Sequence, residues 1–188
     1  MAETTIVADR SGDLRLTETE KRDRYGEVVQ LIEATIADER DLLTCMTSVV
    51  CLLHNALPYF YWTGFYRRVA LRELRVGPYQ GTLGCLTIDF DRGVCGACAR
   101  ERRTIIVPDV DVFPGHIACD SASRSEIVVP VFDAHDRLIA VLDVDSTLPA
   151  AFDEIDQLYL EQVVALLRSK EVLPLVYVPP APSRSVQS

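Results

Sequence analysis

The chain has 188 residues, of which 48% are hydrophobic and 25% are charged, a balance typical of one soluble globular domain. Its formal net charge of −9 argues against binding to nucleic acid or to an anionic membrane surface, because both need concentrated lysine and arginine. Polar residues and Pro58 interrupt the most apolar stretch, residues 42–66, which therefore predicts a buried helix and a strand rather than a membrane span.

The N-terminal sequence predicts a polar arm followed by two helices. Residues 1–19 mix acidic and basic side chains and lack the apolar segment of a secretion signal, so we expect a flexible arm and a cytoplasmic protein. Apolar residues at helical spacing predict a first helix that starts near Glu20 and extends to about Asp38. A second helix, roughly Glu39–Ala56, is expected to end near Pro58, since proline cannot continue it.

The middle of the chain predicts short strands. The aromatic run over residues 59–66 is typical of a strand that places Phe60, Trp62 and Tyr66 on one face. We expect further strands and a short helix at these positions: strands over 73–76, 85–88, 104–107, 126–132 and 138–145, and the helix over 93–101.

The C-terminal sequence predicts a last amphipathic helix over residues 152–167 and a proline-rich, loosely packed tail over residues 171–188. Helices at both ends of a run of antiparallel strands indicate an α+β fold, because strands and helices do not alternate. We therefore expect one domain over residues 20–170.

Residues 126–145 predict a hairpin with a polar turn near His135. Alternation along its second strand assigns Ile139, Val141, Asp143 and Asp145 to one face and Leu138, Ala140, Leu142 and Val144 to the other. This turn brings Glu126 opposite the region of Asp143 and Asp145, so three carboxyl groups are expected to meet. Such a cluster must hold a proton, a metal ion or an organic cation, unless the two aspartates only end the strand and face water.

Six cysteines in a chain without a secretion signal imply reduced thiols. Cys45 and Cys51 fall in the apolar second helix, and we assign both to the core. The other four are Cys85, Cys95, Cys98 and Cys119.

Three interpretations of these four thiols are open. A zinc site could combine Cys95 and Cys98 with Cys85 and either Cys119 or His116. A thioredoxin-type couple at Cys95-x-x-Cys98 lacks the βαβ unit that it would need. A nucleophilic thiol at Cys119 would have His116 three residues before it and would lie on the loop that leads to the carboxylate cluster.

The sequence resembles the free methionine-(R)-sulfoxide reductases, enzymes with a GAF-type fold, over most of the stretch from Tyr25 to Leu167. The resemblance rests on six motifs in order: YWTGFY at residues 61–66, GPYQG at 77–81, RGVCG at 92–96, GHIACD at 115–120, SEIVVP at 125–130 and VLDVDS at 141–146. It implies a central antiparallel sheet with helices on one side and a small enclosed pocket over the other.

The resemblance also implies roles for three cysteines. Cys119 corresponds to the catalytic thiol, and Cys85 to the thiol that forms a disulfide with it, with Cys95 as an alternative or a relay. Cys98 departs from the family pattern and is an additional thiol.

Together these points predict a reaction. The Cys119 thiolate would attack the substrate sulfur while a protonated carboxyl of Glu126 or Asp143 donates to the sulfoxide oxygen, giving a sulfenic acid. Cys85 would convert it to a disulfide, which an external dithiol such as thioredoxin reopens, with no bound cofactor or metal.

The same site is expected to select a free amino acid. Glu126, Asp143 and Asp145 would neutralise the substrate ammonium, which a peptide-bound methionine lacks. Trp62 and Tyr66 would form a wall against its methyl and thioether carbons, although both also suit ordinary core packing.

Two other functions remain as alternatives: a GAF-type module that binds a small molecule without catalysis, and a structural zinc protein. A homodimer through the first helices is a further expectation.

Overall fold

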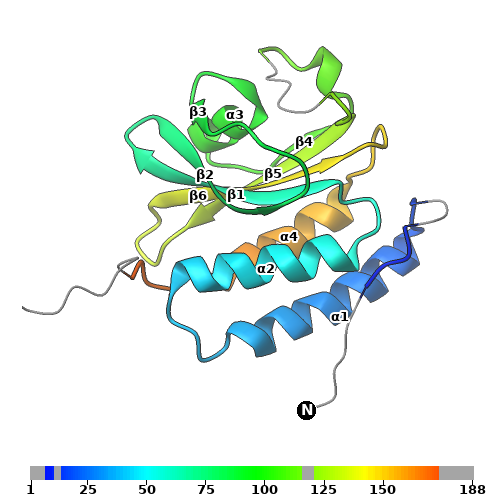
Figure 1. Ribbon diagram of the computed structural model, residues 1–188, viewed down its shortest axis with the longest axis horizontal. Helices are drawn as coiled ribbons and strands as arrows, with labels where there is room; N and C mark the ends of the chain where they lie inside the picture. Colours follow the sequence, from blue (N-terminus) through cyan, green and yellow to red (C-terminus); the bar gives the residue numbers. More distant parts are fainter. Residues whose placement is uncertain (1–6, 11–13, 116–120, 174–188) are drawn as a thin grey trace, which may run out of the picture.

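The computed structural model describes residues 7–10, 14–115 and 121–173. Three helices cover one face of a sheet, and a short fourth helix lies on the other face (Figure 1). The three are α1 (Glu18–Ile36), α2 (Leu42–Ala56) and α4 (Glu154–Ala165), and the fourth is α3 (Gly93–Glu101). In the part of the chain that is described, no helix combines the length and apolarity needed to cross a bilayer.

The sheet has six strands in the order β3-β2-β1-β6-β5-β4, and every neighbouring pair is antiparallel. Their bounds are β1 Trp62–Ala70, β2 Glu73–Gln80, β3 Thr87–Asp89, β4 Ile105–Val107, β5 Ser125–Phe132 and β6 Leu138–Ser146, with a 3₁₀ turn, η1, at Val110–Val112. The expected α+β fold with a central antiparallel sheet is confirmed.

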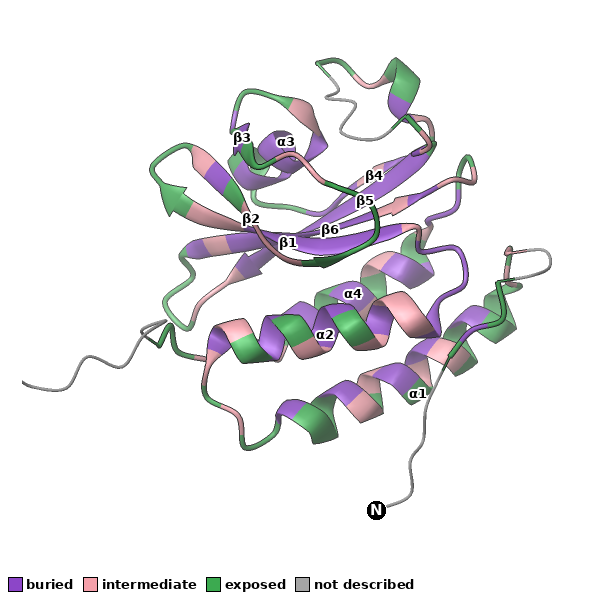
Figure 2. Cartoon of the chain, in the orientation of Figure 1, coloured by how far each residue is buried: buried purple, intermediate pink, exposed green. Residues whose placement is uncertain are grey.

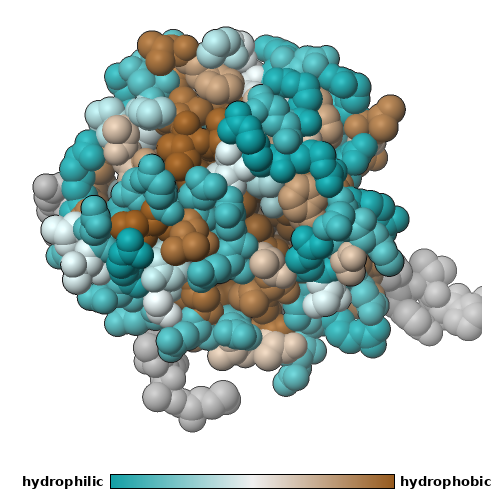
Figure 3. All heavy atoms as spheres, turned by 180° about the vertical axis from the view of Figure 1, so that it is seen from behind, coloured by the Kyte–Doolittle hydropathy of each residue, from teal (hydrophilic) through white to brown (hydrophobic). Residues whose placement is uncertain are grey.

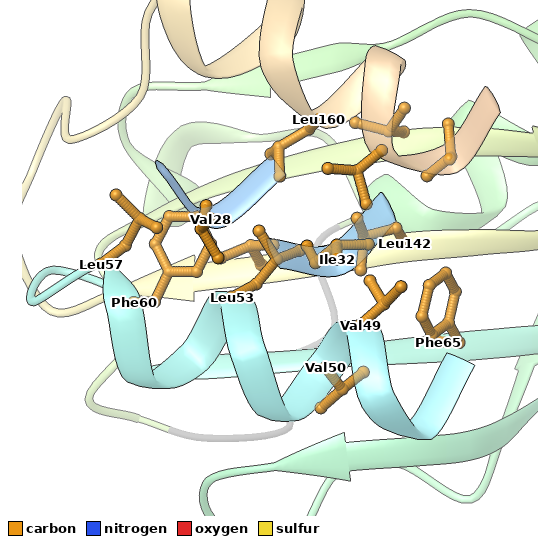
Figure 4. Packing of buried hydrophobic residues seen from close by; sticks show 14 of the residues in the cluster. Val28, Ile32, Val49, Val50, Leu53, Leu57, Phe60, Phe65, Leu142 and Leu160 are labelled. Carbon is orange, nitrogen blue, oxygen red and sulfur yellow. The ribbon is translucent and has the colours of Figure 1, made fainter. Parts of the chain in front are cut away.

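The two faces of the sheet carry separate hydrophobic clusters. The larger one fills the space between the sheet and the three helices, and Val28 and Ile32 of α1 belong to it together with residues of α2, α4 and the sheet (Figure 4). The smaller one lies under α3. Strands β1, β5 and β6 are buried along most of their length because both faces are covered (Figure 2).

A buried ionic group ties the helix layer together. Asp156 of α4 is fully buried and accepts hydrogen bonds from Lys21 Nζ at 2.5 Å, Tyr25 Oη at 2.8 Å and Tyr59 Oη at 2.5 Å. Burial raises the pKa of Asp156, while the Lys21 ammonium and the hydrogen bond from Tyr59 oppose that rise. Lys21 also contacts Asp153 at 2.8 Å, so α1, α4 and the approach to β1 share one polar centre.

Parts of the segment expected to be a flexible arm pack against the domain. Ala8 is buried and its amide donates to Asn55 O at 2.7 Å. Leu14 and Leu16 pack against the larger hydrophobic cluster. At the other end, Glu171 forms an isolated bridge with Asp41, and residues 174–188 lie outside the described residues.

Three assignments from the sequence are wrong. Phe60 precedes β1 and belongs to the helix-side cluster, whereas Trp62 lies on the α3 side. A register shift between β5 and β6 reverses the alternation at Leu138 and Ile139, so Leu138 packs on the α3 side and Ile139 on the helix side. Cys51 is exposed, not in the core.

The space-filling view from behind shows hydrophilic side chains surrounding several smaller apolar areas (Figure 3). Such a surface is normal for a soluble globular domain, as apolar atoms always contribute a large part of the accessible area.

Candidate active site

A small pocket opens on the α3 side of the sheet, between β1, β6, the start of β5 and the first turn of α3. Its walls are mainly apolar, with a few polar groups at one end, as is usual for small-molecule sites. It is lined by Trp62, Tyr66, Thr82, Leu83, Gly84, Ile88, Gly93, Val94, Cys95, Ser123, Glu126, Asp143 and Asp145.

The hairpin register places the three carboxyl groups together, as the sequence predicts. Glu126 pairs with Asp145, and Val128, two residues along β5, pairs with Asp143. Alternate residues of a strand share a face, so Glu126 faces the pocket together with Asp145 opposite it and Asp143 on the diagonal. Glu126 and Asp143 are each 6% exposed, whereas Asp145 is half-buried.

Helix α3 brings a thiol to the same point. Cys95 lies in its first turn, 3% exposed, and its sulfur lies within 4.8 Å of a carboxylate oxygen of Glu126 and of Asp143. The next residue, Gly96, allows this close approach: a Cβ there would lie 2.5 Å from Asp89 O. A side chain at position 96 would push α3 away from the preceding loop.

Burial sets the protonation of the cluster. The pKa of Asp143 rises to about 6 because the side chain is desolvated, although hydrogen bonds with Cys95 and Glu126 oppose the rise. The pKa of Glu126 rises well above its ordinary value, through desolvation first and then through the charges of Asp143 and Asp145. Of the two buried carboxyl groups, Glu126 is therefore the one whose surroundings most favour the protonated form.

One atom of the cluster is left without a partner. Asp143 Oδ1 is buried and has no hydrogen-bond partner among the described residues. A buried carboxylate oxygen that stays unpaired costs free energy, about 1–3 kcal/mol for a polar group. Because Asp143 lines the pocket, a bound ligand can supply the missing contact.

An aromatic stack forms the apolar wall. The Trp62 ring lies between Tyr66, with ring centroids 5.7 Å apart, and Tyr79, at 5.3 Å. Trp62 Nε1 donates to Thr82 O at 2.9 Å, which fixes the ring against the loop that follows β2. A Cβ at Gly84 would lie 3.0 Å from both the Trp62 ring and Tyr66 Oη, so this glycine lets the loop close over the wall.

The described cysteines differ in state. Cys85 is disulfide-bonded and partly buried, whereas Cys95 and Cys98 are buried free thiols. Desolvation, and then the nearby charge of Asp143, raise the pKa of both buried thiols well above the ordinary value. A zinc site that includes Cys85, as considered from the sequence, cannot form in this state, since the sulfur of Cys85 is already bonded.

Cys119 and His116 lie outside the described residues, but the chain on both sides of them is described. Gly93 at the start of α3 donates its amide to Gly115 O at 3.1 Å, and Ser123 lines the pocket. The described chain before and after this stretch thus lies near the pocket, at Gly115 and at Ser123.

Six of the predicted site residues thus line one pocket: Trp62, Tyr66, Cys95, Glu126, Asp143 and Asp145. Sequence reasoning missed Tyr79, Ser123 and the loop 82–84. Gly81, just before this loop, and Gly84, its last residue, were the available signal in the sequence.

Comparison with known proteins finds relatives that share the GAF domain or are named as reductases of free methionine-R-sulfoxide. A model of the GAF domain matches residues 27–169. GAF domain-containing protein A of Dictyostelium discoideum is 41% identical over 155 residues, which cover 82% of this chain and 97% of that protein. The free methionine-R-sulfoxide reductase of Escherichia coli is 38% identical over 147 residues, which cover 78% of this chain and 88% of that protein.

A solved structure is similar over the whole fold. The free methionine-R-sulfoxide reductase of Neisseria meningitidis, determined in complex with its substrate, superimposes with a TM-score of 0.75 at 40% identity. The match covers 85% of this chain and 94% of that protein.

Proposed function

The chain belongs to the GAF domain family and, within it, to the free methionine-R-sulfoxide reductases, and from this premise we propose that it reduces free L-methionine-(R)-sulfoxide to methionine. In our proposal the reaction passes through a cysteine sulfenic acid and an intramolecular disulfide. An external dithiol, with thioredoxin as the expected protein reductant, then restores the thiols.

The observation that carries the proposal is the buried carboxyl of Glu126, whose pKa is raised by burial and by the neighbouring carboxylates, in a pocket with an aromatic wall. A sulfoxide oxygen must be protonated as its bond to sulfur breaks, and a carboxyl group with a raised pKa supplies that proton at neutral pH. The Trp62 ring gives the apolar thioether group a matching surface. The two features adjoin in one pocket.

The attacking group in this proposal is the Cys119 thiolate. It bonds to the substrate sulfur, Glu126 or Asp143 delivers the proton to the sulfoxide oxygen, and the oxygen ends on Cys119 as a sulfenic acid. The substrate sulfur gains two electrons and leaves as a thioether, while the Cys119 sulfur loses two. Support comes from Gly115 and Ser123, which hold the flanking chain beside the pocket.

We assign the resolving step to Cys85. Its thiol would attack the sulfenic acid, releasing water and forming the disulfide. Cys85 is disulfide-bonded, while Cys45, Cys51, Cys95 and Cys98 carry free thiols, which supports Cys119 as the partner. The raised pKa of Cys95 also disfavours it as an attacking thiol.

The carboxylate end of the pocket suits a free amino acid. The unpaired Asp143 Oδ1 and the neighbouring Asp145 can accept from an ammonium group, which a methionine within a peptide does not have. We therefore propose selection for the free substrate.

The test supplies free L-methionine-(R)-sulfoxide with a dithiol and follows methionine formation. The S epimer and a peptide sulfoxide serve as controls, and both should react much more slowly. Retained turnover in Cys119→Ser would exclude the proposed nucleophile.

A second candidate is a binding module without catalysis, favoured by the similarity to a relative named GAF domain-containing protein A. It predicts binding of the sulfoxide, measured by calorimetry, with no methionine formed in the presence of dithiol.

A further inference from the structure

Cys95, Glu126 and Asp143 offer a set of donors that the proposed reduction does not fully use. Within the described residues they form a group in which one sulfur and two carboxylate oxygens all lie within 4.8 Å of one another. In a tetrahedral zinc site, sulfur and oxygen ligands lie about 3.5 Å apart. The three donors therefore need to approach one another by only about 1 Å to share an ion.

An independent observation points to a missing ligand at this place. Asp143 Oδ1 is buried without a hydrogen-bond partner among the residues described, and it belongs to a side chain that lines the pocket. The hydrogen bonds of Asp143 with Cys95 and Glu126 leave this oxygen available. A cation in the pocket would satisfy it.

We propose that Cys95, Glu126 and Asp143 bind a divalent ion of the zinc class, with a fourth coordination position open to the pocket. One thiolate and two carboxylates are too few donors, and too soft a set, for calcium or magnesium, which prefer six or more oxygens. Three protein ligands and one exchangeable position are typical of zinc sites that keep access to solvent or substrate.

Binding must release protons. Metal ligands must be deprotonated, so the Cys95 thiol and the two carboxyl groups give up any proton they hold when they coordinate the ion. Apparent affinity therefore rises as pH rises. Asp145, beside the cluster, adds negative charge that favours the cation.

A consequence for regulation follows, and this part rests on the proposed function. The ion occupies the carboxyl groups that would otherwise donate to the sulfoxide and accept from the substrate ammonium. Metal and substrate should exclude one another, so zinc would inhibit the reductase competitively.

Cobalt(II) titration of the whole protein, in its disulfide form and without substrate, tests the site. We expect one ion per chain, a near-ultraviolet thiolate-to-cobalt charge-transfer band, and displacement by zinc. Cys95→Ser should abolish the band, and Asp143→Asn should weaken binding at least about tenfold while the band is retained at saturation. Cys98→Ser, one helical turn from Cys95, is the matched control and should keep both.

A wild-type protein without the band, a band that persists in Cys95→Ser, or equal loss in Cys98→Ser would overturn the site. If circular dichroism shows that the Cys95→Ser variant is unfolded, an unchanged cobalt affinity in Asp143→Asn overturns the proposed metal site instead. Substrate should raise the apparent Kd for zinc, and the absence of competition would refute the regulatory part. Cobalt binding in a protein that has no reductase activity would refute the proposed function and leave the metal site standing.

Discussion

Glu126 of β5 lies directly opposite Asp145 of β6, and Asp143 lies two residues further along the same face of β6. Three carboxyl groups thus meet under α3, two of them buried, and they cannot all be ionised. This crowding is the basis of the first two predictions.

Glu126→Gln removes the proton donor. We expect kcat to fall by about 10²- to 10⁴-fold, the usual contribution of a general acid. In the wild type kcat should decline as pH rises through the raised pKa of Glu126, because the acid must be protonated to act. The pH–rate profile of the variant should lose this decline, and a profile that keeps it would assign the proton to another group.

Asp143→Asn should stabilise the fold at neutral pH. The pKa of Asp143 in the folded protein is about 6, above its ordinary value, so the folded state binds more protons than the unfolded state. The contribution of Asp143 to stability is therefore fully present below the ordinary aspartate pKa and is lost as pH rises through about 6. Urea unfolding at pH 4 and pH 7 should show a gain of about 1–3 kcal/mol in the variant at pH 7 and little difference at pH 4. A loss of stability at pH 7 would contradict the assignment.

Gly64→Ala should damage the aromatic wall. A Cβ there would lie 2.5 Å from the Trp62 ring and 2.5 Å from Tyr79 Cβ, so the stack must shift. We expect a loss of about 1–3 kcal/mol in unfolding free energy and weaker substrate binding.

Gly26→Ala on α1 is the matched control, because a Cβ there meets nothing within 4 Å. It should leave binding unchanged and stabilise the helix by up to about 1 kcal/mol. Equal effects of the two substitutions on substrate affinity would contradict the role of the wall.

Asp156→Ala should strongly destabilise the protein without a specific effect on catalysis. It leaves the buried Lys21 ammonium with the partly exposed Asp153 as its remaining carboxylate among the described residues and removes the acceptor of Tyr25 and Tyr59, at a cost of about 3–5 kcal/mol. Chemical denaturation measures this loss. Glu171→Gln, which breaks an exposed ion pair with Arg40, should produce no measurable change.

Cys85→Ser should allow reduction of the substrate but block the step that regenerates the Cys119 thiol. A single turnover should still yield one methionine per chain, because the substrate reacts before Cys85 does. The sulfenic acid should then persist and be trapped by a dimedone-type reagent, detected by mass spectrometry. Steady-state turnover with thioredoxin should fall sharply, whereas an unchanged rate would assign the resolving step to Cys95 or Cys98.

Much of the site follows from strand alternation. The spacing of Asp143 and Asp145 and a turn near His135 were sufficient to predict that Glu126 would meet them, and the pairing is confirmed. Alternation failed near the turn, where a register shift exchanges the faces of Leu138 and Ile139. Such a shift depends on how the two strands pair, and the alternation of apolar and polar residues in the sequence does not reveal it.

Other features depend on contacts between distant segments. The loop over Trp62 is held by Thr82 and shaped by Gly84, and only the folded structure brings these residues together. Cys51 was assigned to the core because its helix is apolar, but it lies on the exposed face of α2. Phe60 was misplaced because β1 begins only at Trp62.

The stacking of Trp62 between Tyr66 and Tyr79 has a practical consequence. Trp62 is the only tryptophan of the chain, so the intrinsic fluorescence excited at the red edge of its absorption comes from the pocket wall alone. Its indole N–H bonds the loop that leads to Cys85, so its emission should respond both to a molecule entering the pocket and to opening of the disulfide. The protein therefore carries its own optical reporter, which can follow binding and redox state in real time without a label.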